Sequence, residues 1–127
     1  MERAKVYFTP EISPDALQRM YHALERSLTG RVAVKISTGE PGGHNFLQPS
    51  LIRELVEELQ GTIVECNTAY AGRRNTTGEH WKAIAEHGFL DIAPCDIMDE
   101  DGELSIPVNG GKHLTENLRP KSFWNSV

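Results

Sequence analysis

Cysteine is scarce in this sequence. The two cysteines, Cys66 and Cys95, lie far apart, and no CxxC pair occurs. This spacing excludes a disulfide framework and a zinc ribbon, and two cysteines cannot supply the four ligands of an iron–sulfur cluster within one chain. We interpret both residues as reduced thiols, which are typical of a cytoplasmic protein.

Long apolar runs and clusters of positive charge are lacking too. The N-terminal apolar run ends at Phe8, far short of the hydrophobic region of a signal peptide or of a membrane span. The chain carries 13 Lys and Arg against 18 Asp and Glu, and no basic stretch could follow a phosphate backbone. We therefore expect neither a membrane nor a nucleic acid as a partner.

The remaining composition is that of an ordinary globular domain. Hydrophobic residues make up 39% of the 127 residues and charged residues 24%, with 11 Gly and 7 Pro. A chain of this length supports one hydrophobic core. We predict a single domain over residues 1–117, followed by an irregular tail over residues 118–127.

Three segments have the apolar spacing or the capping residues of helices. The first runs from Ser13, an N-cap followed by proline, towards Gly30, and the second lies between Pro49 and Gly61. The third starts with the capping-box spacing of Thr76 and Glu79 and ends at Gly88. The sequence therefore predicts about three helices.

Short runs of β-branched and aromatic residues alternate with these helices and predict strands. Strand followed by helix, repeated along the chain, is typical of βαβ units with right-handed crossovers. We predict an α/β fold with a mostly parallel, doubly wound sheet of four to five strands, helices on both faces, and a small C-terminal hairpin-like addition. The predicted strands are Val6–Phe8, Val32–Ile36, Thr62–Cys66, Phe89–Ile92 and, in the addition, Leu104–Val108.

A glycine-rich loop follows the predicted strand that ends at Ile36. Ligands of open parallel sheets bind outside the carboxyl ends of strands, where glycine lets the backbone approach a ligand closely. The alternative is a solvated loop whose glycines only form turns. The candidate ligand-binding glycines are Gly39, Gly42 and Gly43, and the candidate acid–base groups or ligands of a divalent metal are Glu40 and His44.

Two adjacent arginines, Arg73 and Arg74, precede the third predicted helix. Guanidinium groups and free backbone N–H groups both favour carboxylate or phosphate, so the pair predicts a site for a small anion. The alternative is that the pair neutralises Glu65 or the acidic turn at Asp99 and Asp101. We also expect the loop that carries Glu40 and His44 to face the same cleft as Arg73, because both loops leave the carboxyl ends of strands that should be neighbours in the sheet.

Other polar residues of the same segment complete the candidate site. Cys66 stands at the end of a predicted strand, where it is either a nucleophile or a small core residue. The further candidate ligand-binding residues are Asn67, Tyr70 and His80.

Three stretches of this sequence resemble the N-terminal part of a known but uncharacterised family, domain of unknown function 362. The stretches are VYFTPEISPDAL, VAVKISTGEPGGHNFLQPSLIRELV and ECNTAYAGRRNTTGEHWKAIAEHGF, with the elements KxxxGE…P, NTxYxGRR and H…HGF in order over about residues 5–117. Members of that family are usually much longer, and many end in cysteine runs that hold iron–sulfur clusters. The resemblance implies that this chain is truncated and holds one wall of any active site.

Two functions follow from these observations. The first is a ligand- or metal-binding N-terminal portion of a larger enzyme-like protein, with an anion-binding loop; the sequence names no reaction. The second is a non-catalytic interaction or structural module. In either case we expect a homodimer or a higher oligomer, joined through Leu104–Val108 and the tail with Phe123 and Trp124, because a shortened sheet leaves an edge uncovered.

Overall fold

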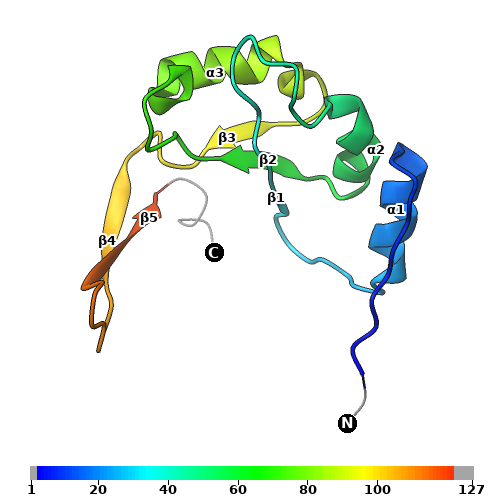
Figure 1. The fold of residues 1–127 in the computed structure, drawn as a ribbon, viewed down its shortest axis with the longest axis horizontal. Coiled ribbons are helices and arrows are strands. Elements are labelled where there is room, and N and C mark those ends of the chain that lie inside the picture. The colour runs from blue at the N-terminus through cyan, green and yellow to red at the C-terminus, as the bar shows by residue number, and fades with distance from the viewer. Residues whose placement is uncertain (1–2, 122–127) are drawn as a thin grey trace.

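A computed structural model describes residues 3–121, apart from the side chains of Arg119 and Pro120. Helices and strands alternate from α1 to β3, as the sequence predicts for its central part (Figure 1). The helices are α1 (Pro14–Ala23), α2 (Pro49–Glu58) and α3 (Thr77–Glu86), with two short 3-10 helices, η1 (Arg73–Asn75) and η2 (Phe89–Asp91). The strands are β1 (Ala33–Lys35), β2 (Thr62–Glu65), β3 (Cys95–Ile97), β4 (Glu103–Pro107) and β5 (Glu116–Pro120).

The first three strands form a parallel sheet in the order β1-β2-β3. Val34 is paired with Ile63, and Ile63 with Cys95, so these three residues lie on one face of the sheet. Each new strand is added on the same side of the previous one, and right-handed crossovers then place both connecting helices on one face. Figure 1 shows α2 and α3 on the same side of the sheet. Within residues 3–121 this sheet has three strands and their order does not reverse, so the predicted doubly wound sheet of four to five strands with helices on both faces is not confirmed.

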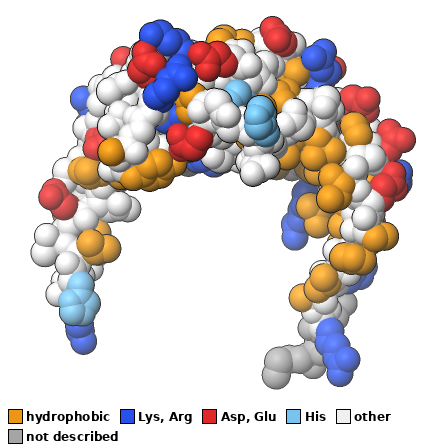
Figure 2. Space-filling view, turned by 45° about the horizontal axis from the view of Figure 1, so that its top comes forward, with side chains coloured by type: hydrophobic (Ala, Val, Ile, Leu, Met, Phe, Trp, Pro, Cys, Tyr) orange, Lys and Arg blue, Asp and Glu red, His pale blue; other side chains and the backbone are white. Residues whose placement is uncertain are grey.

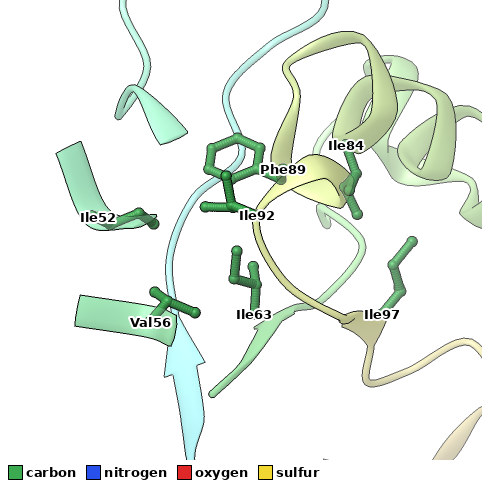
Figure 3. Packing of buried hydrophobic residues seen from close by; sticks show 7 residues of the cluster. All are labelled: Ile52, Val56, Ile63, Ile84, Phe89, Ile92 and Ile97. Carbon is green, nitrogen blue, oxygen red and sulfur yellow. The ribbon is translucent and has the colours of Figure 1, made fainter. Parts of the chain in front are cut away.

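The hydrophobic core lies between that face and the helices (Figure 3). Phe89 and Ile97 have no exposed surface, and Ile63 and Ile84 have 1%. The members of the core cluster are Ile52 and Val56 from α2, Ile63 from β2, Ile84 from α3, Phe89 and Ile92 from the turn after α3, and Ile97 from β3.

Two predicted strands are wrong. Phe89–Ile92 forms the turn of η2, because Gly88 leaves α3 with φ +79 and the chain bends back at once. Phe89 and Ile92 stand three residues apart on this turn, and both point into the core. Val6–Phe8 pairs with no strand among the described residues. It lies beside α1, with Val6 89% and Phe8 84% exposed.

The helix boundaries follow the capping residues closely, with two exceptions. Ser13 caps α1 as predicted, because its Oγ accepts a hydrogen bond from the Ala16 N–H. The helix ends at Ala23, well before Gly30, and leaves Leu28 half-exposed. At α3, Thr76 is the N-cap residue but its side chain makes no capping hydrogen bond.

The hairpin-like addition is confirmed. β4 and β5 pair antiparallel with each other and with no other strand among residues 3–121. β5 continues to Pro120, past the expected start of the tail at residue 118, while Phe123 and Trp124 lie outside the described residues. No helix in the described part of the chain is long and apolar enough to cross a membrane.

Candidate functional site

Polar side chains meet at the carboxyl ends of β1 and β2, which are neighbours in the sheet. The loop after β1 crosses towards α3 (Figure 1), and the segment after β2 returns to the same place through η1. We call this cluster the carboxyl-end network. Its members are Thr38, Glu40, Glu65, Tyr70, Arg74 and His80.

Glu65 is the centre of the network and the last residue of β2. It lies two residues after Ile63, so it points to the helix-covered face, where it is only 4% exposed. Its carboxylate accepts hydrogen bonds from the backbone N–H of Thr38 at 3.1 Å and from the Thr38 hydroxyl at 2.6 Å. His80 Nε2 lies 2.5 Å from Oε2 of Glu65, and Arg74 Nη1 lies 2.8 Å from Oε1 of the same carboxylate.

The electrostatics of Glu65 follow from these four contacts. Burial alone raises its pKa, but the hydrogen bonds from His80 and Thr38 outweigh burial and lower the pKa to about 2. The carboxylate is therefore charged at neutral pH. Because a carboxylate oxygen only accepts, His80 Nε2 must carry the proton in this contact.

Arg74 joins Glu65 to the surface. Its side chain is 5% exposed, and its Nη1 atom faces Glu65. The opposite edge faces Glu40, whose Oε1 lies 2.5 Å from Nη2 and 3.1 Å from Nε. The hydroxyl of Tyr70 lies 2.8 Å from Nη2 and donates to the same oxygen of Glu40 at 2.7 Å. Burial lowers the pKa of Arg74, but the contacts with Glu40 and Glu65 give a net increase, so the guanidinium stays charged.

Glu40 is placed by a turn that needs glycine. Gly39 has φ +84, and a Cβ at this position would stand 2.3 Å from the Cβ of Phe46. Gly43 donates its N–H to the Glu40 carbonyl at 2.9 Å, which closes the turn, and Gly42 has φ +78. The three glycines therefore shape this turn, and their part in binding a ligand stays a prediction. The Glu40 side chain remains 49% exposed, and Arg74 lowers its pKa.

His80 is held from both sides. It has no exposed surface, and its Nδ1 lies 3.2 Å from Oδ1 of Asn67. Asn67 is fixed in turn, because its side-chain amide donates to Thr77 Oγ1 and its backbone N–H donates to Asp99. Asn67 thus supports His80 and has no direct contact with the guanidinium of Arg74 among the contacts described.

The two arginines have different environments. Arg73 points to the exposed side of α3, where it pairs with Glu79 at 3.2 Å and with Glu86 at 3.4 Å. Arg74 pairs with Glu65, as the alternative interpretation had it, and Asp99 takes no part in that pairing. The loop that carries Glu40 does converge on the arginine pair, but it meets Arg74 and not Arg73.

Two other candidates lie apart from the network. His44 is exposed and makes no hydrogen bond within residues 3–121. Cys66 is half-buried, and burial together with the charge of Asp99 raises the pKa of its thiol, which is unfavourable for a nucleophile. Among the described residues no three His, Cys, Asp or Glu side chains form a group that could hold a metal ion, and a divalent metal at Glu40 and His44 stays a prediction.

Sequence reasoning missed Thr38 and its neighbour His87, and it underrated Glu65. Thr38 is fully buried and donates twice to Glu65, and its carbonyl lies 2.6 Å from His87 Nδ1. His87 also stacks on Phe46, with ring centroids 3.9 Å apart. Glu65 itself was considered only as a counter-ion. A signal was present, because a charged residue two positions after Ile63 in a predicted buried strand must point into the core.

Comparison with curated proteins and with solved structures found no match. A family model matches residues 32–126, which include the whole carboxyl-end network and the β4–β5 hairpin. The chain belongs to the family described as Domain of unknown function (DUF362).

Proposed function

We propose that this chain is a ligand-binding domain whose carboxyl-end network holds a small anion, a carboxylate or a phosphate group, on Arg74 in place of Glu40. The observation that carries the proposal is the asymmetry of the two carboxylates on one buried guanidinium. Glu65 is 6% exposed in its side chain, whereas Glu40 is 49% exposed.

The contact between Arg74 and Glu65 is retained when a ligand binds. Glu65 has three further hydrogen-bond donors from Thr38 and His80, so its departure would leave several buried polar groups without partners. This contact fixes the guanidinium in one orientation. A fixed guanidinium loses little conformational freedom when it binds a ligand.

The contact between Arg74 and Glu40 is the one that a ligand replaces. Glu40 uses one oxygen, Oε1, for all its contacts with Nε, Nη2 and the Tyr70 hydroxyl. A ligand that offers two oxygens to Nε and Nη2 forms the bidentate pair that guanidinium groups prefer. Glu40 sits on a surface turn and can move into water, where its charge is solvated. The half-exposed Tyr70 hydroxyl supplies a further donor to the incoming anion.

The family resemblance and this site together suggest the N-terminal portion of a larger enzyme-like protein. The proposal covers binding and names no reaction. A resident metal ion is not part of it, because the described residues offer no three-ligand group. The alternative is a non-catalytic interaction or structural module.

The experiment compares thermal unfolding in phosphate or malonate with unfolding in chloride at matched ionic strength. The variants are Glu40→Ala, which empties the exposed side of Arg74, and Glu57→Ala, a control on the exposed face of α2. We expect both multivalent anions to stabilise the wild-type chain more than chloride does. We expect a larger shift for Glu40→Ala, because the anion then has no internal competitor.

The size of the effect follows from mass action. At ten times its Kd an anion stabilises the folded state by about 1.4 kcal/mol, which raises the Tm of a domain of this size by about 5 °C. Glu57→Ala should respond as the wild type does. If Glu40→Ala responds to phosphate and malonate no more than Glu57→Ala does, the exchange of Glu40 for an anion is wrong.

A further inference from the structure

The contacts of Glu40 in the described part of the chain include one cationic group, the guanidinium of Arg74. The neighbouring Arg73 pairs with Glu79 and Glu86 on the exposed side of α3. Figure 2 shows basic and acidic side chains intermingled over this helix, so the positive charge there is already compensated. An anion that replaces Glu40 therefore meets a single positive charge at the surface.

The buried charges beneath Glu40 nearly cancel. Arg74 contributes one positive charge and Glu65 one negative charge, and their side chains are 5% and 6% exposed. His80, whose Nε2 donates to Glu65, adds one further positive charge at most. Once Glu40 leaves, these groups carry a net charge between zero and +1. The charge of Glu65 is felt at this position, because it raises the pKa of Glu40 against the larger lowering by Arg74.

The hydrogen-bond donors around Glu40 are few. Nε and Nη2 of Arg74 and the hydroxyl of Tyr70 all face Oε1, and Oε2 accepts no hydrogen bond within residues 3–121. Gly72 and the Tyr70 ring line the side of Oε2, since a Cβ at Gly72 would lie 3.7 Å from this oxygen and 3.9 Å from Cε2 of Tyr70. Three donors serve the two oxygens of a carboxylate. A phosphate brings further oxygens, which would meet an aromatic ring and a glycine there.

We propose that the anion bound on Arg74 is the single carboxylate of a small organic acid, and not a phosphate group. This inference rests on the proposed exchange of Glu40 and names the class of its ligand. A monoanion restores the one negative charge that leaves with Glu40. A phosphate group carries about −1.5 to −2 charges near pH 7, and its excess charge lies beside the buried carboxylate of Glu65, where like charges repel strongly. Glu40 is then an internal stand-in for the ligand, with the same functional group.

The first experiment uses Glu40→Ala, because the Cγ atom and carboxylate that this change removes have the size and charge of acetate. Thermal unfolding of the full chain is measured at pH 7 over a series of acetate or phosphate concentrations, with chloride keeping the ionic strength constant. Glu57→Ala, on the exposed face of α2, is the matched control for the general effect of each salt on stability. The difference between the two variants gives a Kd for each anion at Arg74.

We expect the Kd of acetate to be about fivefold lower than that of phosphate, a difference of about 1 kcal/mol, because like charges that are brought close cost at least this much. Equal or tighter binding of phosphate would overturn the carboxylate inference and leave the exchange of Glu40 standing. If neither anion stabilises Glu40→Ala more than Glu57→Ala, the exchange itself is wrong and the inference is wrong with it.

The second experiment uses the wild-type chain, so that the test holds even where Glu40→Ala does not fold. The chain is labelled with ¹⁵N, and the Nε–H signal of Arg74 is followed by NMR during titration with acetate or phosphate. This nitrogen lies 3.1 Å from Glu40 Oε1, so its N–H changes acceptor when an anion replaces Glu40. The signal is assigned by its shift in Glu40→Gln. We expect acetate to saturate the change at a lower concentration than phosphate does. The reverse order would refute the inference, and a signal that neither anion moves would refute the exchange as well.

Discussion

Replacing Glu65 by Gln tests whether the carboxyl-end network contributes to stability through charge. The change keeps the shape of the side chain and removes its negative charge. Arg74 then loses its buried counter-ion, and the donors of Thr38 and His80 face a neutral amide. Removing one partner of a buried ion pair destabilises a protein because the other charge stays desolvated.

The magnitude follows from the pKa of Glu65, which is about 2 in the folded chain against an ordinary value of 4.5. A shift of this size corresponds to about 3 kcal/mol of stability at pH 7. The pKa is lowered on folding, so the contribution is complete above the pKa of the unfolded chain. It is lost as the pH falls from about 5 towards 2.

The assay is urea-induced unfolding of wild type and Glu65→Gln at pH 7 and at pH 3. We expect the gap in unfolding free energy to be about 3 kcal/mol at pH 7 and roughly half of that at pH 3, because the carboxyl group is then protonated in the unfolded chain but still mostly charged in the folded chain, so that unfolding takes up a proton. The control is Glu57→Gln on the exposed face of α2, for which we expect almost no gap at either pH. A gap for Glu65→Gln that is equal at both pH values would refute the reasoning.

Three further predictions use the same unfolding assay at pH 7. Gly39→Ala should destabilise by more than about 1 kcal/mol, because its φ of +84 disfavours a side chain and the new Cβ would collide with Phe46; an unchanged midpoint would contradict the turn. Ser13→Ala should cost about 1 kcal/mol and Thr76→Ala much less, since only Ser13 makes a capping hydrogen bond; equal losses would contradict this difference. Phe89→Ala should cost about 3–5 kcal/mol because the ring is fully buried, and a small loss would mean that the core collapses to fill the cavity.

Local signals in the sequence predicted the parts of the fold that local interactions determine. The N-cap at Ser13 and the apolar spacing of α2 depend on residues within a few positions of each other, so the sequence displays them directly. The hairpin at Leu104–Val108 follows for the same reason, from alternation and a nearby turn.

Tertiary contacts decided the parts that were predicted wrongly. Phe89–Ile92 has the composition of a strand, but Gly88 turns the chain and the core takes Phe89 and Ile92 as a helical pair. Val6–Phe8 has the same composition and pairs with no described strand. The composition of a segment indicates that it can form a β-strand, but it does not indicate which edge of a sheet is available for pairing.

The candidate site was likewise predictable only in part. Parallel strands bring their carboxyl ends together, so the convergence of the Glu40 loop with the arginine segment could be expected from topology. Which of the two arginines, Arg73 or Arg74, contacts this loop could not be predicted, because both precede the same helix. Only the placement of η1 turns Arg74 inwards to Glu65 and leaves Arg73 on the surface of α3.

Stability alone is a weak reason for burying these charges. A buried ion pair loses much of its Coulombic gain to desolvation, and apolar residues of similar volume often stabilise a core equally well. Here a neighbouring apolar core already exists, with Ile63 two residues before Glu65 and Ile84 four residues after His80. The charges are therefore better explained by what they hold at the surface. Glu65 fixes one edge of the Arg74 guanidinium inside the protein. The other edge contacts a single carboxylate oxygen of Glu40, which is an exposed residue on the glycine turn. That arrangement keeps a guanidinium charged and oriented beneath an exposed glutamate at the carboxyl ends of two parallel strands, and it supports the proposal that a small anion replaces Glu40.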